Sequence, residues 1–207
     1  MILWNMLFPN RCLICGNVIE IDKPVCDNCS NSFSIEPYIQ TIPNGCLCVS
    51  AFDHSRKYRK YMLDYKFDNK KYYYKNYAAV INIIVNEVWG DIKFDYYTSV
   101  PTHKDKIKKR GYHQTRLIAV NSADLKHCKY KPLLIQTKNN KSQHSLSAAE
   151  RKLNAKNIYA FSNKCNITGK TILLIDDVVT TGATLSECAD ILLENGAKAV
   201  YCAAINR

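Results

Sequence analysis

Apolar runs separated by polar segments predict alternating strands and helices after residue 46. From residue 55 to 89 the apolar positions repeat with helical spacing, in two pieces divided near Asp68-Asn69, and another helix is predicted from about Gln114. Thr102–Gly111 and Lys138–Gln143 are polar and predict loops, and residues 10–45 show little periodicity. Strands are predicted at Leu47–Phe52, Tyr96–Val100 and Leu133–Ile135.

The clearest predicted unit lies near the carboxyl end of the sequence. Thr171–Ile175 is a continuous apolar run, typical of a strand covered on both faces of a parallel sheet. Thr184-Leu185-Ser186-Glu187 fits a capping box, and a helix with an apolar face follows as far as Asn195-Gly196. With a last strand at Ala199–Ile205, this order predicts a right-handed βαβ unit in a Rossmann-like α/β domain with a mostly parallel sheet.

The chain has 207 residues, enough for one α/β core and a small accessory module. We divide it into an N-terminal module, residues 1–47, and a main domain, residues 48–207. No run approaches 18 consecutive apolar residues, so the sequence predicts no membrane span. Met1–Pro9 is apolar but has no positive leader and no small-residue cleavage site, which favours a cytoplasmic location.

Charge is distributed unevenly along the chain. The net charge is +11, of which residues 1–47 carry −2 and the remainder +13. Such asymmetry favours a polyanionic partner for the main domain. A lysine-rich solubilising surface is the alternative.

Four of the ten cysteines form two closely spaced pairs, C-x2-C-x10-C-x2-C. In a chain without a secretory leader this spacing favours zinc over a disulfide framework, and redox-active thiols are the alternative. Four thiolates complete the tetrahedral shell of one zinc ion, so we expect the site to be structural. Cys46 and Cys48 are spaced wrongly for a further pair. The predicted ligands are Cys12, Cys15, Cys26 and Cys29.

The segment between Ile175 and the following helix has the composition of a phosphate-binding loop. Backbone N–H groups, three hydroxyl groups and a glycine precede a helix N-terminus, where the helix dipole favours an anion. Asp176 and Asp177 could accept hydrogen bonds from ribose hydroxyl groups beside a 5′-phosphate, or help to hold Mg²⁺. Two acidic residues that merely end a strand are the alternative. The loop residues are Thr180, Thr181, Gly182, Ala183 and Thr184.

The stretch from Leu173 to Thr184 resembles the signature of type I phosphoribosyltransferases, in which apolar residues and two acidic residues precede a Thr-Thr-Gly-x-Thr loop. Together with the cysteine pairs, the whole chain resembles the ComF/GntX family of competence-associated, phosphoribosyltransferase-like proteins. Two departures are Arg-Gly-Tyr-His-Gln in place of the frequent Arg-Gly-Phe-Asn-Gln, and the shortened pair Cys46-x-Cys48. The other motifs are Val100-Pro101, Arg110-Gly111-Tyr112-His113-Gln114, Gln143-His144-Ser145-Leu146, Arg151, Asn154 and Phe161.

The resemblance implies a type I phosphoribosyltransferase fold that binds phosphoribosyl pyrophosphate (PRPP) or a ribose phosphate with Mg²⁺. It also implies a role beside the proteins of DNA uptake. The loop after Val100-Pro101 would then occupy the place of pyrophosphate in true transferases. Its composition fits, although a solvated basic loop is equally consistent with its charge. The basic residues are His103, Lys104, Lys106, Lys108, Lys109 and Arg110, against Asp105 alone.

Residues 56–75 interleave lysine and arginine with tyrosine, a composition suited to single-stranded nucleic acid. Tyrosines that only pack against the sheet are the alternative. The candidates for contact with DNA are Lys66, Tyr72, Tyr73, Tyr74, Lys108, Lys109 and Arg110.

Two functions follow from these features. The first is a binding protein that handles single-stranded DNA during uptake and natural transformation and retains a site for PRPP-type ligands. The second is an enzyme that transfers the phosphoribosyl group to a nucleobase or other acceptor, with Asp176, Asp177, Mg²⁺ and the basic loops as its catalytic apparatus. The sequence shows no cluster that would recognise an acceptor base, which favours the first.

Overall fold

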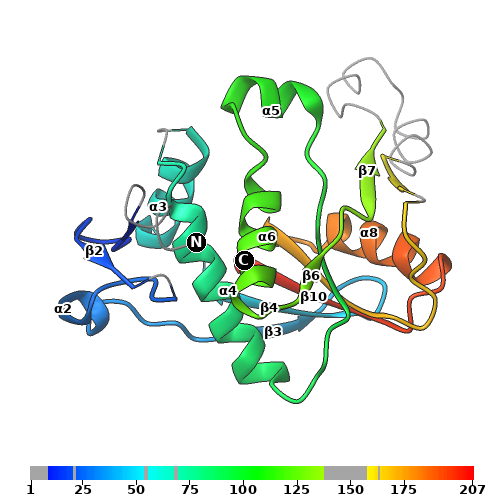
Figure 1. Ribbon diagram of the computed structural model, residues 1–207, viewed down its shortest axis with the longest axis horizontal. Coiled ribbons are helices and arrows are strands. Elements are labelled where there is room, and N and C mark those ends of the chain that lie inside the picture. The colour runs from blue at the N-terminus through cyan, green and yellow to red at the C-terminus, as the bar shows by residue number, and fades with distance from the viewer. Residues whose placement is uncertain (1–8, 21, 54–55, 68–69, 138–157, 163) are drawn as a thin grey trace.

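The computed structural model of the chain describes residues 9–20, 22–53, 56–67, 70–137, 158–162 and 164–207 (Figure 1). Its helices are α2 (Asp27–Ser30), α3 (Arg56–Phe67), α4 (Tyr73–Trp89), α5 (Lys104–Arg110), α6 (Gln114–Leu125) and α8 (Ala183–Glu194). Its strands are β1 (Asn10–Arg11), β2 (Val18–Ile19), β3 (Tyr38–Thr41), β4 (Leu47–Phe52), β5 (Tyr96–Ser99), β6 (Lys129–Tyr130), β7 (Leu134–Gln136), β8 (Tyr159–Phe161), β9 (Thr171–Val178) and β10 (Ala199–Asn206).

Six strands form the central sheet in the order β3-β4-β10-β9-β5-β6. Five of them run parallel, and β3 pairs antiparallel with β4 at one edge. In the central pair, Ile175 lies opposite Ala203 and Asp176 lies opposite Ala204. The carboxyl ends of the parallel strands meet at one edge of the sheet, where open α/β sheets bind their ligands.

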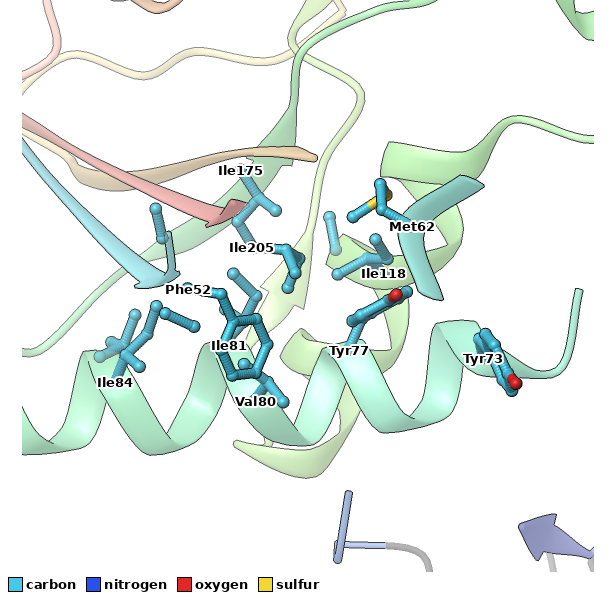
Figure 2. Packing of buried hydrophobic residues seen from close by; sticks show 14 of the residues in the cluster. Phe52, Met62, Tyr73, Tyr77, Val80, Ile81, Ile84, Ile118, Ile175 and Ile205 are labelled. Carbon is cyan, nitrogen blue, oxygen red and sulfur yellow. The ribbon is translucent and has the colours of Figure 1, made fainter. Parts of the chain in front are cut away.

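Helices cover both faces of this sheet. On one face α4 and α6 pack against β4, β10, β5 and β9, and Figure 2 shows side chains of these elements meeting around Ile81, Ile118 and Ile205. On the other face α8 and the β7–β8 hairpin cover a second apolar cluster, which includes Leu174 and Cys188. The predicted α/β architecture with a mostly parallel sheet is therefore confirmed.

Most of the predicted elements are present. The strand Leu47–Phe52 is β4, and the helical stretch forms α3 and α4 on either side of residues 68–69. The predicted strand at Thr171–Ile175 is longer than expected. Because β9 continues to Val178, Asp176 and Asp177 lie within the strand itself.

The loop predicted at Thr102–Gly111 is wrong, because Lys104–Arg110 form α5. The His103 ring nitrogen Nδ1 accepts a hydrogen bond from the backbone N–H of Asp105 at 3.2 Å, and Gly111 ends the helix. An acidic residue in the first turn and basic residues in the last turn both interact favourably with the helix dipole. These charges stabilise a short helix that has no apolar stripe to reveal it.

The predicted capping box at Thr184–Glu187 is also wrong. The N-cap of α8 is Gly182, in a left-handed conformation and without a side chain, and the backbone N–H of Ala183 donates to Thr181 Oγ1 at 3.4 Å. Glu187 Oε1 accepts from the backbone N–H of Ile158 at 3.0 Å, and so it serves the β7–β8 hairpin instead. The left-handed glycine starts the helix ahead of Thr184 and overrides the local signal.

The cysteine-rich segment forms the β1–β2 hairpin and the short helix α2. Our division of the chain at residue 47 remains a prediction, and β3, from the first part, contributes an edge strand to the main sheet. The predicted loop at 138–143 and the motif residues at 143–154 lie outside the described residues. Within the described part, no helix is long and apolar enough to cross a bilayer.

Candidate functional site

The four predicted zinc ligands come together in space. The sulfur atoms of Cys12, Cys15, Cys26 and Cys29 all lie within 4.8 Å of one another, and those of Cys15 and Cys26 are 3.6 Å apart. Four sulfurs bound tetrahedrally at about 2.3 Å from one zinc ion would be separated by about 3.8 Å. The arrangement therefore fits a tetrathiolate metal site.

Backbone donors surround the same sulfur atoms. Burial alone would raise the pKa of Cys12, but hydrogen bonds from the backbone of Cys15, Cys26 and Ile14 lower it to about 6. A lowered pKa favours the thiolate of Cys12, which is the form that binds a metal ion, whereas the hydrogen bond with Cys26 and burial raise the pKa of Cys29 to about 12. All ten cysteines of the chain are free thiols.

The cysteine cluster is joined to helix α4 through one buried side-chain amide. Asn76 of α4 is fully buried, and its Nδ2 donates to the carbonyl oxygens of Arg11 and Pro24, each at 2.7 Å. Arg11 and Pro24 precede the first and second cysteine pairs by one and two residues. The two metal-binding turns are thus tied to the helix that carries much of the core.

The predicted phosphate loop lies at the carboxyl end of β9. Four of its residues, Thr180, Thr181, Ala183 and Thr184, are exposed, whereas Gly182 is buried. Together with Asp176 these residues line a hollow of about 40 Å³. The N-cap residue Gly182 has no side chain to cap α8, and the backbone N–H of Ala183 donates to Thr181 Oγ1 at 3.4 Å. Backbone N–H groups in the first turn of a helix have no partner within the helix, and the residues of this turn line the hollow. The geometry is that of an anion site at a helix N-terminus.

Gly182 brings the loop against the N-terminal half of the chain. Its φ is 74°, and a Cβ atom built on it would lie 2.6 Å from Ile42 Cγ2. The same β3–β4 turn holds α8 through Asn44, whose Nδ2 donates to the Asp190 carboxylate at 2.8 Å and to the Ser186 carbonyl at 3.3 Å. The hairpin therefore fixes the position of the phosphate loop.

The two aspartates point to opposite faces of β9. Along the strand, Ile172 and Leu174 belong to the cluster under α8, and Leu173 and Ile175 to the cluster under α6. By this alternation Asp176 follows the first pair and faces the phosphate loop. Burial, and then the nearby charge of Asp177, raise the pKa of Asp176 to about 8.

Asp177 lies at the centre of a buried polar network. Its Oδ2 accepts from Lys66 Nζ of α3 at 2.9 Å and from Gln114 Nε2 of α6 at 2.5 Å. Gln114 Oε1 in turn accepts from Arg110 Nη1 of α5, and the Gln114 carbonyl accepts from Tyr65 Oη at 2.9 Å. The network brings the ends of α3, α5 and α6 to the carboxylate of Asp177.

α5 carries positive charge toward the same edge of the sheet. The ammonium groups of Lys66 and Lys106 both lower the pKa of Asp176 against the larger effect of burial. The end of α5 reaches this edge through Arg110, which donates to Gln114 beside Asp177. Lys104, Lys108 and Lys109 are exposed on this helix. In Figure 1 α5 stands above the sheet, away from the core.

His113 explains one departure from the family sequence. It is the N-cap of α6, and its Nδ1 accepts from the backbone N–H of Arg116 at 3.2 Å, as an asparagine oxygen would. Burial, and then the charge of Arg116, lower the pKa of His113 to about 4. A neutral imidazole keeps the acceptor nitrogen that capping requires.

The predicted DNA-contacting residues fall into two groups. Lys108 and Lys109 are exposed, Tyr72 is 38% exposed and Tyr74 is partly exposed. Tyr73, at 5% exposure, packs at an edge-to-face angle against Tyr77 in the core, and Lys66 is turned inward to Asp177. Tyr73 and Lys66 are therefore not available to a strand on the surface.

The roles of Gln114 and Lys66 in the network around Asp177 were not predicted from the sequence. The Arg-Gly-Tyr-His-Gln motif was the signal for Gln114, because this stretch supplies the end of α5 and the start of α6. No local pattern marked Lys66, which meets Asp177 across 111 positions of sequence.

Comparisons with known proteins agree with this architecture. A family model described as the phosphoribosyl transferase domain matches residues 119–206. The chain is 28% identical over 201 residues to the DNA utilization protein YhgH of Escherichia coli (strain K12), covering 91% of this chain and 86% of that protein. It is 26% identical over 141 residues to Competence protein F of Haemophilus influenzae (strain Rd), covering 66% of this chain and 62% of that protein.

These relatives and the domain match support the ComF/GntX family. Among solved structures, the chain is similar to the allosteric regulatory enzyme of purine biosynthesis, with a TM-score of 0.50 and 16% identity. That likeness covers 69% of this chain and 30% of the enzyme chain, and it concerns the fold alone.

Proposed function

We propose that this ComF/GntX protein binds PRPP or a related ribose phosphate at the β9–α8 loop and handles single-stranded DNA during DNA uptake and natural transformation. The observation that carries the ligand assignment is the juxtaposition of the α8 N-terminus, whose N-cap residue is a glycine, with Asp176 in one hollow. A 5′-phosphate would accept hydrogen bonds from the loop, and the adjoining ribose would donate to the carboxylate. Neither half of this site alone would select a sugar phosphate.

Mg²⁺ fits the same site. A carboxyl group whose pKa is raised by burial and by a second carboxylate is stabilised in its ionised form by a nearby cation. Asp176 is thus the residue that would face a Mg²⁺-bound ligand, while Asp177 holds Lys66 and Gln114. Bound Mg²⁺ would neutralise charge on the ligand's diphosphate.

The DNA assignment rests on charge and on the relatives. Lys104, Lys108 and Lys109 of α5 are exposed beside the ligand edge, and the part of the chain after residue 47 carries a net charge of +13. The names of the relatives refer to DNA utilization and competence. We place the protein in the cytoplasm, since ten cysteines that form no disulfide, four of them clustered as for a metal ion, suit a reducing compartment.

The four clustered cysteines complete the proposal as a structural zinc site. The cluster lies at α4, through Asn76, and away from the β9–α8 loop. All four positions of a tetrahedral ion would be filled by Cys12, Cys15, Cys26 and Cys29, so the ion would stabilise the fold and take no part in chemistry.

A titration of labelled single-stranded oligonucleotide, with and without PRPP and Mg²⁺, tests the proposal. Calorimetry with PRPP and Mg²⁺ on the wild type, Asp176→Asn and Asp124→Asn tests the ligand site. Asp124 is exposed in the last turn of α6, so Asp124→Asn removes the same charge from another surface and should bind as the wild type does. PRPP affinity that is equal in all three proteins would remove Asp176 from the site.

The alternative is an active phosphoribosyltransferase. The presence of both a phosphate loop and Asp176 favours it, because these features bind the donor of such reactions. Release of pyrophosphate from PRPP on addition of a panel of nucleobases would establish this reading. Retention of oligonucleotide without any such release would favour the binding protein.

A further inference from the structure

An aromatic ring stands exposed at the end of α3, one residue after the lysine that contacts Asp177. Phe67 is 59% exposed, more than Tyr38 at 44% or Tyr72 at 38%. A single exposed apolar side chain is ordinary on a protein surface. The Phe67 ring is distinguished by its position beside Lys66 and by the guanidinium group of Arg110, which lies over it.

Two routes connect Phe67 to the ligand site. Along the chain, its neighbour Lys66 donates to Asp177 at 2.9 Å. Through space, the guanidinium carbon of Arg110 lies 5.1 Å from the centre of the Phe67 ring. Arg110 also donates to Gln114, and Gln114 Nε2 donates to Asp177 at 2.5 Å. The ring and the guanidinium group are therefore held at the rim of the site that ends at Asp177.

A phenylalanine ring beside a fixed guanidinium group is suited to planar, electron-rich ligands. Nucleobases stack on aromatic rings and on arginine, with little dependence on which base is present. The exposed lysines Lys108 and Lys109 directly precede Arg110 on α5 and could contact the phosphates of a strand. An apolar protein partner would gain nothing from this surrounding positive charge.

We propose that Phe67 and Arg110 form a stacking site for a nucleobase on the Asp177 side of β9, next to the ribose phosphate site at Asp176. The inference rests on the proposed function in assuming that nucleotides reach this edge of the sheet. It assigns the aromatic contact to a residue outside the tyrosine run at 72–74. The ligand class is a single-stranded DNA base or the base of a free nucleotide.

The test compares a base-bearing oligonucleotide containing 2-aminopurine with an abasic strand of the same length. Each stacked base contributes about 1–3 kcal/mol, so the wild type should bind the base-bearing strand about 5- to 150-fold more tightly. Phe67→Ala should abolish this preference and the fluorescence quenching of 2-aminopurine. Phe67→Trp should retain both. None of these variants should change the dependence of affinity on salt, because no charge is removed.

Leu63→Ala is the matched control, because Leu63 lies one helical turn earlier and is 42% exposed. It should leave the preference for bases unchanged. The inference is overturned if Phe67→Ala keeps the full preference for base-bearing strands, whereas the proposed DNA function would stand. If the wild type retains no strand at low salt, 2-aminopurine riboside 5′-monophosphate becomes the probe. Quenching that depends on Phe67 would then support the stacking site without the DNA function. Absence of quenching would overturn the stacking site.

Discussion

Replacing Gly182 by alanine should destabilise the protein by two separable effects. The residue has a φ of 74°, in the left-handed region that costs an L-residue about 1–2 kcal/mol. The new Cβ would also lie 2.6 Å from Cγ2 and 2.9 Å from Cβ of Ile42, which is 3% exposed. Overpacking a buried site typically costs about 1–3 kcal/mol. The expected total is about 2–5 kcal/mol.

Gly169→Ala separates the two effects. Gly169 has nearly the same φ, 72°, but an added Cβ would meet nothing within 4 Å. This variant should lose only the conformational part, about 1–2 kcal/mol. In a chain of this size 1 kcal/mol corresponds to about 2–4 °C in Tm. The two variants should therefore differ by several degrees.

Urea unfolding of the zinc-loaded proteins, followed by two probes to verify a single transition, measures both losses. If the new Cβ clashes with Ile42, the phosphate loop must shift relative to the β3–β4 turn that holds it. Gly182→Ala should then weaken PRPP binding as well as stability. Equal destabilisation by Gly182→Ala and Gly169→Ala would refute the packing argument. It would mean that Ile42 moves aside without cost.

Four further predictions concern metal, ligand, DNA and pH. Protein purified without added metal should contain about one zinc per chain, and Cys26→Ser should lose it and destabilise the N-terminal segment; native protein with fully titratable thiols and no zinc would contradict this. Replacing Asp176 and Asp177 together by asparagine should weaken PRPP binding in calorimetry, and unchanged affinity would exclude the pair. Each phosphate contact adds about −0.7 to the slope of log affinity against log salt for single strands. The double variant Lys108→Ala with Lys109→Ala should therefore lower both the affinity for single-stranded DNA and the steepness of this slope. An unchanged slope would show that these lysines do not contact DNA. The pKa of Asp176 is raised to about 8, so the folded state holds a proton that the unfolded state releases near pH 4. Stability should therefore fall as pH rises between about 4 and 8, and Asp176→Asn should remove that part of the fall, as urea unfolding at several pH values would show.

Local patterns predicted the parts of this protein that depend on local chemistry. The spacing of the cysteines and the order of residues from Leu173 to Thr184 each specify a turn and its neighbours, so both were visible in the sequence. The continuous apolar run of β9 likewise predicted a buried parallel strand. The cysteine pairs, the phosphate loop and β9 can be predicted without knowing which segments pack against them.

Other features depend on contacts between distant segments. Tyr72 and Tyr73 are consecutive and chemically identical, and only the packing of α4 against its neighbours decides that one is exposed and the other buried. The capping box was present in sequence, but Gly182 and the β7–β8 hairpin gave its residues other partners. α5 is too short and too polar for periodicity to reveal it.

The position of the two aspartates within β9 constrains what the site can bind. Consecutive strand residues point to opposite faces, so Asp176 and Asp177 cannot readily act as a chelating pair for one ion at about 2.1 Å. Asp177 is balanced by Lys66, whereas Asp176 faces the loop with a raised pKa. A phosphate in the loop would raise the pKa of Asp176 further, so the carboxyl group would stay protonated or, once ionised, would repel the phosphate. A ligand that brings hydroxyl donors or a cation together with its phosphate would instead stabilise the carboxylate, and we therefore expect the site to prefer a ribose phosphate to free phosphate above the pKa of Asp176.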